Sequence, residues 1–350
     1  MTDLNPDTSP IFVVGTGRSG TTLLRLMLNA HPRIYLTHEA AFYVGGNFLP
    51  RKSTGSDWLE IYFKSFSYAW LRLDPQTVRD EIAKTHPTGL ARDERPVAYN
   101  ALMRCMARRY DKPRHGDKTP FHASFLKGIF RDYPDPRVVH ILRDPRATVH
   151  SLQRMPWAPG SMILNNRYCR QIIRETRPFK DRIHEIRLED LLADTRSVMQ
   201  GVLEFVGEPF DERVLDHTHH APLEDTPPFP WLLTATKKRD TKPRTGWSDT
   251  IPPAWIRQIE KRNRIYFEEY GYELATLATN PSALARYKAV FADFPEANRF
   301  LRRFIPLIYK LTRQNPPTAE VAQNLLLQLN PRAWSHYPDF QMPERPAPLP

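Results

Sequence analysis

The sequence has little cysteine and no long apolar run. Only two of the 350 residues are cysteines, Cys105 and Cys169, and no CxxC pair suggests a zinc site. Two isolated thiols exclude a disulfide framework and fit a reducing compartment. No apolar run is long enough to span a bilayer, and the N-terminal MTDLNPDTSP lacks the basic and apolar regions of a signal peptide. We therefore expect a cytoplasmic protein.

Acidic residues are outnumbered by basic ones. The chain has 39 Asp and Glu against 50 Lys and Arg, which gives a formal net charge of +11. Such a surplus predicts an anionic partner: a phosphorylated cofactor, a nucleic acid or an acidic surface. The basic residues are spread along the chain, and no RRM, KH or zinc-finger pattern occurs, so we expect no nucleic-acid partner.

Strand and helix signals alternate through most of the chain. Short apolar runs predict strands at 11–14, 34–36 and 138–142. Apolar periodicity and capping residues predict helices at 21–30, 98–109, 122–131, 195–206 and 253–270, with a further one that starts at Asp144 and Pro145. The alternation predicts an α/β fold in which a parallel sheet carries helices on both faces.

Two regions depart from this alternation. Residues 41–110 have a mixed, aromatic-rich pattern that predicts a helical insert. After about Glu273 the composition changes, and a basic amphipathic stretch at 299–313, interrupted by Pro306, precedes a proline-rich tail. We therefore expect one α/β domain at 10–273, with the insert inside it, and a C-terminal helical extension at 274–350.

The strongest local signal is a loop rich in glycine and hydroxyl groups between the first strand and the first helix. It runs from Gly15 to Thr22 with the sequence GTGRSGTT. Glycines let the backbone approach a ligand closely, and the amides at a helix N-terminus attract phosphate. Arg18 adds a full charge, and the hydroxyls of Ser19, Thr21 and Thr22 can donate hydrogen bonds. The loop therefore predicts a phosphate site.

Two other interpretations fit parts of this loop. Gly15, Gly17 and Gly20 match GxGxxG, and Glu39 follows about twenty residues later, as in a Rossmann-type NAD(P)-binding oxidoreductase. Gly15 and Gly20 also have Walker A spacing, although Thr21 stands where an NTPase needs lysine. An arginine and three hydroxyls suit a compact terminal phosphate better than a pyrophosphate held mainly by backbone. The Rossmann enzyme is therefore kept as the alternative.

Two segments together carry a family resemblance. GTGRSGTTLLRLMLNAHP resembles the 5'-phosphosulfate loop of sulfotransferases that depend on 3'-phosphoadenosine-5'-phosphosulfate (PAPS), especially bacterial members and tyrosylprotein sulfotransferases. Their second signature, an arginine at a strand end and a serine eight residues later, resembles RDPRATVHS from Arg143 to Ser151. The resemblance implies a P-loop-NTPase-like sheet, PAPS as sulfuryl donor, no metal, and a 3'-phosphate held by Arg143 and Ser151. The residues that it implies for the 5'-phosphate are Arg18, Ser19, Gly20, Thr21 and Thr22.

The same resemblance implies the catalytic groups. Glu39 falls where tyrosylprotein sulfotransferases place their catalytic glutamate, and we expect it to be the general base for the acceptor hydroxyl. Lys118, in GDKTP, resembles the lysine that acts near the transferring sulfuryl group, and Arg18 is expected to stabilise charge there too. Lys242 and Arg244 lie in a segment that resembles the family's basic loop over the nucleotide.

The sequence leaves the acceptor open. Residues 186–190 resemble a further strand of the family, but Leu188 replaces the tyrosine of the tyrosylprotein enzymes, which weakens the case for the same substrate. The acceptor hydroxyl can belong to a small molecule, a glycan, a lipid or a peptide, and the insert at 41–110 is expected to shape its pocket. The stretch at 299–313 suits peripheral contact with an anionic membrane, and the oligomeric state, including a homo-oligomer, stays open.

Histidines supply two further alternatives. His38 is the other candidate for the base, and because neighbours on a strand point to opposite faces, only one of His38 and Glu39 should face the pocket. His217, His219 and His220 lie close together in the sequence, but no carboxylate or cysteine spacing supports a metal site. We therefore expect no metal ligands there.

Overall fold

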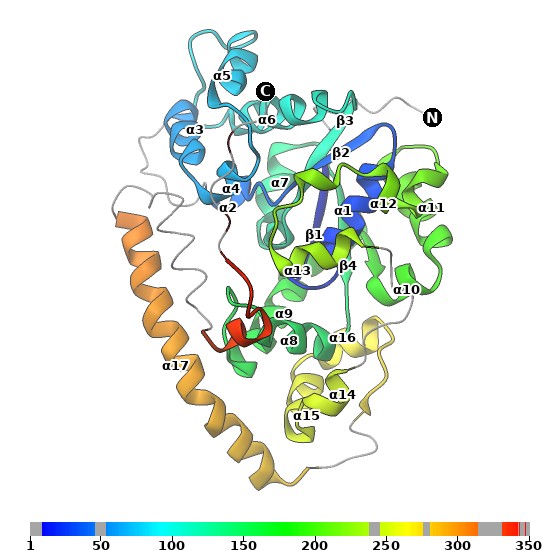
Figure 1. The fold of residues 1–350 in the computed structure, drawn as a ribbon, viewed down its shortest axis with the longest axis vertical. Coiled ribbons are helices and arrows are strands. Elements are labelled where there is room, and N and C mark those ends of the chain that lie inside the picture. The colour runs from blue at the N-terminus through cyan, green and yellow to red at the C-terminus, as the bar shows by residue number, and fades with distance from the viewer. Residues whose placement is uncertain are drawn as a thin grey trace.

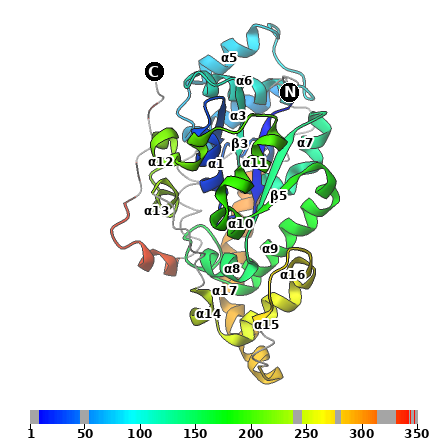
Figure 2. The same cartoon turned by 90° about the vertical axis from the view of Figure 1, so that its right-hand side faces the viewer.

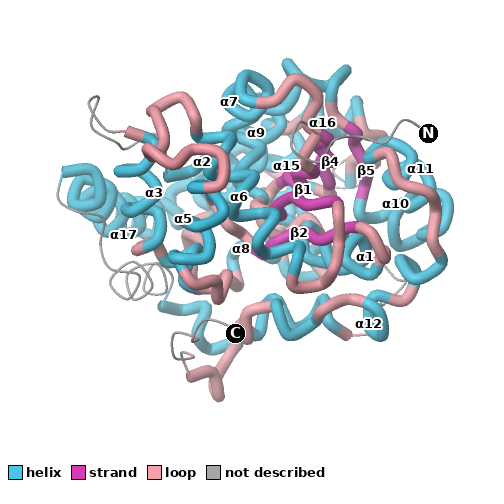
Figure 3. Tube along the Cα trace, turned by 90° about the horizontal axis from the view of Figure 1, so that it is seen from above, coloured by secondary structure: helices cyan, strands magenta, loops and turns pink. Residues whose placement is uncertain are grey.

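A five-stranded parallel β-sheet forms the centre of the protein (Figure 3). The computed structural model describes residues 9–45, 54–237, 246–275, 281–313, 331–341, 343 and 347. Within these residues the strand order is β2-β3-β1-β4-β5, and every neighbouring pair is parallel. The strands are β1 (Ile11–Gly15), β2 (Ile34–His38), β3 (Arg114–Lys118), β4 (Arg137–Leu142) and β5 (His184–Arg187).

Alternate side chains of the central strand enter two separate cores. Phe12 and Val14 of β1 pack with the helical insert, while Ile11 and Val13 pack on the opposite face of the sheet. All of β1 is buried, as is typical of a parallel strand that is covered on both faces. Gly116 of β3 permits the close pairing with β1, because a Cβ there would lie 1.8 Å from the carbonyl oxygen of Ile11.

Helices cover both faces of the sheet (Figures 1 and 2). The α-helices are α1 (Thr21–Ala30), α2 (Phe42–Gly45), α3 (Gly55–Phe63), α4 (Phe66–Ala69), α5 (Pro75–Ala83), α6 (Arg95–Arg108), α7 (Leu126–Asp132), α8 (Pro145–Gln153), α9 (Met162–Thr176), α10 (Leu188–Ala193), α11 (Thr195–Val206), α12 (His217–His220), α13 (Pro230–Leu233), α14 (Trp247–Thr250), α15 (Pro253–Arg262), α16 (Arg264–Glu269) and α17 (Ala283–Arg313). α1, α10 and α11 pack on one face, and α6, α7 and α9 pack on the other. The α/β fold with helices on both faces is therefore confirmed.

The ends of most predicted strands and helices lie within a few residues of those in the structure. The helices at 21–30 and 195–206 begin and end where the sequence predicts. The strand predicted at 186–190 is wrong in its second half, because β5 ends at Arg187 and Leu188 begins α10. Two acidic residues in the first turn of α10 favour a helix there, since they complement the positive end of the helix dipole.

Two predicted helices are divided. The segment at 253–270 forms α15 and α16, which meet at Asn263. The Asn263 amide donates to the carbonyl of Ile259 at 2.8 Å and to Asn166 Oδ1 at 2.6 Å, and such side-chain bonds compete with the helical ladder. The segment at 122–131 begins as the 3-10 helix η2 (Pro120–Phe125) before α7.

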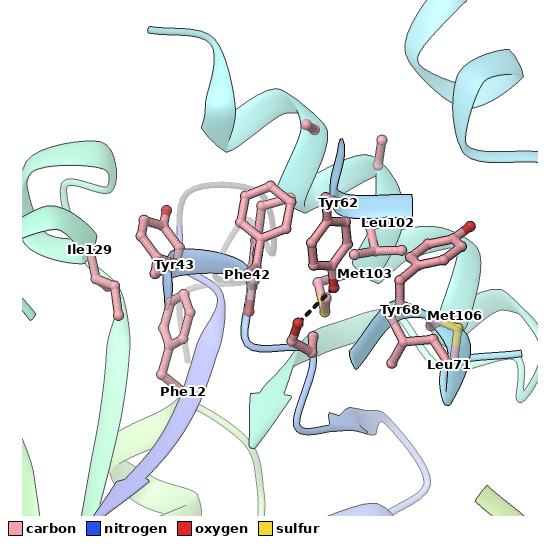
Figure 4. Close-up of a cluster of buried hydrophobic side chains, with 14 of the residues drawn as sticks. Phe12, Phe42, Tyr43, Tyr62, Tyr68, Leu71, Leu102, Met103, Met106 and Ile129 are labelled. Carbon is pink, nitrogen blue, oxygen red and sulfur yellow. Dashed lines mark hydrogen bonds between the residues drawn. The ribbon is translucent and has the colours of Figure 1, made fainter. Parts of the chain in front are cut away.

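The helical insert predicted at 41–110 is present in its described part as α2 to α6. Its aromatic rings are buried, and Figure 4 shows Phe42, Tyr62 and Tyr68 in one cluster with Phe12 of β1. Trp58 stacks on Tyr62 with ring centroids 5.2 Å apart. These rings therefore build the core that joins the insert to the sheet. The influence of the insert on the acceptor pocket stays a prediction.

The C-terminal extension contains the long helix α17, which runs along the outside of the molecule (Figure 1). The expected interruption at Pro306 is wrong, because a proline removes one helical hydrogen bond but can kink a helix without ending it. Asp293 fixes α17 to the start of α9, where it accepts hydrogen bonds from Ser161 Oγ at 2.6 Å and the Met162 amide at 2.8 Å. In the described part of the chain, no helix is long and apolar enough to cross a membrane.

Candidate active site

The phosphate loop joins β1 to α1 and offers donors for an anion. Gly20 is the N-cap of α1, with a left-handed backbone (φ 103°) and no side-chain cap. The amides of the first turn of α1 therefore receive no acceptor from the cap residue. Ser19 is 1% exposed, and its hydroxyl has no hydrogen-bond partner among the described residues. Amides at a helix N-terminus and a spare hydroxyl are the groups that bind phosphate, so this loop fits one.

Other parts of the fold pack closely against this loop. The positive φ of Gly20 favours glycine, and a Cβ there would lie 2.7 Å from Leu188 Cδ1, so the leucine side chain would have to move. Leu188, the first residue of α10, thus lies against the phosphate loop. The amide of Gly17 donates to the hydroxyl of Tyr168 at 3.2 Å. The loop is therefore held by α9 and α10.

Arg18 connects the phosphate loop to the second signature. Its Nε donates to Ser151 Oγ at 3.2 Å, and its Nη1 donates to the carbonyl of Trp231 at 2.9 Å. Arg143 Nη1 donates in turn to the backbone carbonyl of Arg18 at 2.9 Å. The sequence assigns Arg18 to one phosphate and Ser151 to the other, and the structure brings the two side chains into contact. Both predicted phosphate sites therefore belong to one cluster.

Helix α8 begins as the sequence predicts. Asp144 is its N-cap and accepts from the amide of Arg146 at 2.8 Å, and Pro145 occupies the first turn. Asp144 also pairs with the Arg146 side chain, while Asp190 lies 3.6 Å from Arg187. Asp144 thus serves both as the cap of α8 and as the partner of the Arg146 side chain.

Glu39 and Lys118 form an ion pair at the carboxyl ends of β2 and β3. Lys118 Nζ donates to Glu39 Oε1 at 2.7 Å and to Thr22 Oγ1, in the first turn of α1, at 3.4 Å. The Lys118 side chain is fully buried, whereas 41% of the Glu39 side chain is exposed. Lys118 is thus no surface lysine, and the pair lies beside the phosphate loop with the carboxylate open to solvent.

The sequence predicted that His38 and Glu39 point to opposite faces of the sheet, but in the structure both side chains lie beside Lys118. Lys118 Nζ lies 3.4 Å from His38 Nδ1 as well as 2.7 Å from Glu39. The reason is that β2 ends at His38, and Glu39 has a positive φ of 23° that turns its side chain back toward Lys118. His38 is 9% exposed. Of the two candidate bases, Glu39 is therefore the more accessible to an acceptor.

The turn that carries Glu39 is fixed by backbone hydrogen bonds. Its amide donates to the carbonyl of Lys118 at 2.8 Å. The Ala40 amide donates to Asp117 Oδ1 at 3.2 Å, and the Ala41 amide donates to Thr119 Oγ1 at 3.0 Å. Ala41, like Glu39, has a positive φ, of 50°. Strained residues of this kind persist only where the surroundings hold them, and they are frequent at functional sites.

Burial changes the protonation of the groups around the pair. It lowers the pKa of Lys118, which Glu39 raises and Arg25 lowers further. The pKa of His38 lies well below its usual value because of burial and the nearby Lys118 ammonium. Burial raises the pKa of Asp117 to about 7, although hydrogen bonds from Ala40 and Thr119 lower it. His38 is therefore neutral near pH 7 and a weaker base than an ordinary histidine.

The sheet order argues against a dinucleotide fold. In a Rossmann sheet β2 lies next to β1, so that the acid at its end reaches the ribose of a cofactor on the β1 loop. Here β1 pairs with β3 and β4, and β3 separates it from β2. Glu39 is instead paired with Lys118. The geometry therefore does not favour the Rossmann alternative.

Some predicted residues lie outside the site or outside the described residues. Lys242 and Arg244 belong to a segment that the structure does not describe. His217 Nε2 lies 2.9 Å from the carbonyl of Ala235, and His219 Nδ1 lies 2.8 Å from Asp216 Oδ2. Among the described residues, no group of three or more His, Cys, Asp or Glu side chains could hold a metal ion.

The sequence did not point to several residues that support the site. Only Asp117 and Thr119 had a signal, because they flank Lys118 in GDKTP. Tyr266 holds Arg143 by accepting from its amide at 3.2 Å and donating to its carbonyl at 2.9 Å. This contact joins parts of the chain that are 123 residues apart, so no local pattern could reveal it.

The parallel sheet, with a phosphate loop at the end of its central strand, defines a P-loop-like α/β protein. Within this class the chain belongs to the sulfotransferase family, because the model described as "Sulfotransferase family" matches residues 10–212. The matched range is more than half of the chain. It contains the phosphate loop, Glu39, Lys118 and the second signature.

Named relatives and a solved structure agree with this family. The Protein-tyrosine sulfotransferase of Drosophila melanogaster is 26% identical over 218 residues, which cover 59% of this chain and 40% of the relative. Protein-tyrosine sulfotransferase A of Caenorhabditis elegans is 28% identical over 225 residues, or 60% of this chain and 53% of the relative. The chain thus spans about half the length of these curated relatives. The sulfotransferase domain of the Synechococcus PCC 7002 olefin synthase has the same fold, with a TM-score of 0.54, 21% identity, and coverage of 78% of this chain and 98% of that domain.

Proposed function

We propose that the protein transfers a sulfuryl group from PAPS to an acceptor hydroxyl and releases 3',5'-bisphosphoadenosine (PAP). One observation carries the proposal: the Glu39–Lys118 ion pair lies in a braced turn beside a helix N-terminus that fits a phosphate. Membership of the sulfotransferase family supports it. Sulfuryl transfer needs an aligned acceptor, a proton acceptor and charge stabilisation at the leaving phosphate, and this site offers groups for the last two.

Each group in the site has a defined task in this reaction. Glu39 takes the proton of the acceptor hydroxyl as the hydroxyl oxygen bonds to sulfur and the opposite sulfur–oxygen bond breaks in line. The electron pair of that bond stays on the leaving phosphate, which the Gly20 to Thr22 amides and Arg18 hold. Lys118 stabilises the charge that develops on the bridging oxygen. Arg143 and Ser151 hold the 3'-phosphate and so position the donor.

The acceptor is an alcohol or phenol on a small molecule, a glycan, a lipid or a peptide. Two of the relatives act, by name, on protein tyrosine. The sequence resemblance places Leu188 where those enzymes have a tyrosine, and Leu188 lies against Gly20 in this chain, which supports a different acceptor. A panel of acceptors from all four classes, incubated with labelled PAPS, identifies the class.

Ligand-induced thermal stabilisation tests the donor. At a hundred times its dissociation constant, a ligand adds about 2.7 kcal/mol to the free energy of unfolding. We expect PAP to stabilise the protein strongly, AMP weakly, and NAD or magnesium ATP not at all. Arg143→Ala and Ser151→Ala should remove most of the advantage of PAP over AMP. The control is Arg196→Ala on helix α11, which removes an exposed ion pair with Glu212.

Two results would contradict the proposal. Stabilisation by NAD without stabilisation by PAP would establish the Rossmann alternative. Stabilisation by PAP that persists in full in both the Arg143 and Ser151 variants would remove the assigned 3'-phosphate site. With PAP binding established, release of PAP from PAPS in the presence of an acceptor measures the transfer itself.

We also propose a peripheral contact between α17 and an anionic membrane. The side chains of 302–313 are outside the described residues, so the basic part predicted at 299–313 is argued from sequence alone. The described part adds exposed apolar side chains, those of Leu284, Tyr287, Phe291, Phe294 and Leu301. Binding to phosphatidylserine vesicles that falls in Phe291→Ser and Phe294→Ser variants would support the contact. Unchanged binding, or loss of a dimer in light scattering instead, would contradict it.

A further inference from the structure

A second cation lies buried beside the Glu39–Lys118 pair. Arg25 is three residues after Thr22 on α1, so the two side chains share one face of the helix. The Thr22 hydroxyl lies 3.4 Å from Lys118 Nζ. Arg25 is 0% exposed, although the polar side of a helix ordinarily faces water. The Arg25 guanidinium is therefore a buried charge on the helix face that carries Thr22.

Arg25 is anchored by one side-chain hydrogen bond and has spare donors. Its Nη2 donates to Thr226 Oγ1 at 2.7 Å, while Nε and Nη1 are buried with no hydrogen-bond partner among the described residues. Burial lowers the pKa of Arg25, and Tyr35, Asp225 and Glu39 raise it. A guanidinium remains charged throughout the ordinary pH range. Arg25 is thus a permanent positive charge within electrostatic range of Glu39.

Tyr35, Tyr110 and Asp225 lie near Arg25 and interact with its charge. Tyr35 donates a short hydrogen bond to Asp225, and Tyr110 stacks on Tyr35 with ring centroids 4.8 Å apart. Tyr110 also donates to Glu224 at 3.4 Å. The segment that carries Glu224 and Asp225 (η5, Leu223–Asp225) leads directly to Thr226, the anchor of Arg25. These contacts hold the segment whose next residue, Thr226, anchors the guanidinium.

We infer that Arg25 is a positioning residue for the Glu39–Lys118 pair. The inference rests on the proposed function, in which Lys118 stabilises the charge on the bridging oxygen, and adds that Lys118 turns from Glu39 to do so. At that moment Glu39 loses its ion-pair partner. The positive charge of Arg25, which Thr226 holds in place, still attracts the Glu39 carboxylate. It therefore keeps this carboxylate deprotonated and in the site, ready to accept the proton. Neither the phosphates nor the acceptor needs to touch Arg25.

The groups that face Lys118 give this role a measurable sign. They are Glu39 and His38 from the end of β2, Arg25 from α1, and Asp117 from β3. Arg25 lowers the pKa of Lys118, so its removal should raise that pKa. If protonated Lys118 is needed for transfer, the alkaline limb of the kcat profile then moves to higher pH.

The test compares Arg25→Met with Arg25→Lys, Thr226→Val and the exposed control Arg196→Met. We expect Arg25→Met to lower kcat by about tenfold or more, while KM and the Kd for PAP change by less than about twofold. Arg25→Lys should restore most of the rate, and Thr226→Val should lower kcat about threefold without weakening PAP. The control should match the wild type. An unchanged kcat in Arg25→Met, or an equal loss of kcat and PAP affinity, would overturn the inference.

Two further measurements separate this inference from its premise. If Arg25→Met does not fold, Thr226→Val decides, and an unchanged kcat in that variant rejects the role. The pKa of Lys118, followed by NMR and assigned by its loss in Lys118→Met, needs no turnover. A higher pKa in Arg25→Met supports the electrostatic coupling, and an unchanged pKa rejects it. If the wild type binds PAP but transfers nothing from PAPS, the proposed function fails on its own.

Discussion

The hydroxyl of Tyr62 donates a hydrogen bond of 2.8 Å to the carbonyl oxygen of Ala40 (Figure 4). Tyr62 lies on α3 of the insert, and Ala40 directly follows Glu39. The insert thus reaches the turn that carries the candidate base. Together with Asp117 and Thr119, it holds in place a backbone that is strained by the positive φ angles of Glu39 and Ala41. The aromatic core therefore contributes to the site by positioning.

Removal of the Tyr62 hydroxyl should affect both stability and activity. Tyr62→Phe keeps the ring but deprives a buried carbonyl of this donor, so we expect the free energy of unfolding to fall by about 1–3 kcal/mol. The kcat should fall as well, because the Glu39 turn is less well fixed. Urea denaturation and steady-state kinetics measure the two effects. Tyr287→Phe, on the exposed side of α17, is the matched control, and a Tyr62→Phe variant as active and stable as the control would refute the brace.

Asp117 should make stability depend on pH. Its pKa is raised to about 7 by burial, so the fold favours the protonated carboxyl. Stability from this group is complete below the unfolded-state pKa and is lost as pH rises through about 7. Asp117→Asn keeps the shape and an acceptor for the Ala40 amide but does not titrate. Between pH 5.5 and 8.5, the free energy of unfolding of the variant should therefore rise by about 1 kcal/mol or more relative to that of the wild type.

Thermal unfolding at the two pH values measures this gain. The comparison is made between pH values, because the changed contact with His122, whose Nδ1 lies 3.2 Å from Asp117 Oδ2, shifts the variant equally at both. Burial lowers the pKa of His122 to about 3, so this histidine is neutral at both values. A stability difference that is the same at pH 5.5 and pH 8.5 would mean that Asp117 keeps an ordinary pKa.

The parts of the site that could be predicted from sequence lie within single strand–turn–helix units. The phosphate loop and the segment from Arg143 to Ser151 each form one such unit, so their glycines, caps and charges can be recognised locally. The same holds for the parallel sheet, whose fully buried strands and alternating helices give periodic signals. These features depend on neighbours in the chain.

The supporting contacts depend on distant residues and could not be predicted. The carbonyl that accepts from Arg18 belongs to Trp231, 213 residues away, and every residue type carries such a backbone carbonyl. The turn at Glu39 was also missed, because strand alternation assumes an extended backbone that Glu39 leaves at φ 23°. Tertiary hydrogen bonds decided both features.

The phosphate loop should not tolerate a side chain at Gly20. Gly20→Ala places a Cβ 2.7 Å from Leu188 Cδ1 in a left-handed conformation, which disfavours an L-residue by about 1–2 kcal/mol. We expect a lower melting temperature and weaker PAP binding. Leu188→Ala in the same chain should relieve the contact but not the backbone strain, so it should recover only part of the loss.

A second glycine provides the control for this substitution. Gly201 lies inside α11, and the nearest atoms to the Cβ that alanine would add are those of the His184 ring at 3.8 Å, an ordinary van der Waals distance. Gly201→Ala should therefore leave PAP binding unchanged and stability equal or slightly higher, because alanine has the higher helix propensity. If Gly20→Ala behaved like Gly201→Ala, neither the left-handed turn nor the contact with Leu188 would be needed for the phosphate site.

Lys118 should show a conflict between stability and activity. Its ammonium is fully buried, and burial lowers its pKa, so the folded state disfavours the charged form at neutral pH. Lys118→Met removes that penalty and leaves Glu39, 41% exposed, to be solvated. We expect the variant to be as stable as the wild type or about 1 kcal/mol more stable at pH 7, while kcat falls about a hundredfold or more and PAP binds nearly as before.

The stability advantage should shrink as pH rises through the folded-state pKa of Lys118, because the wild-type lysine then becomes neutral. Melting curves at pH 7 and pH 10, together with PAP titrations, provide the test, and a strongly destabilised variant would show that the ion pair serves the fold more than the reaction.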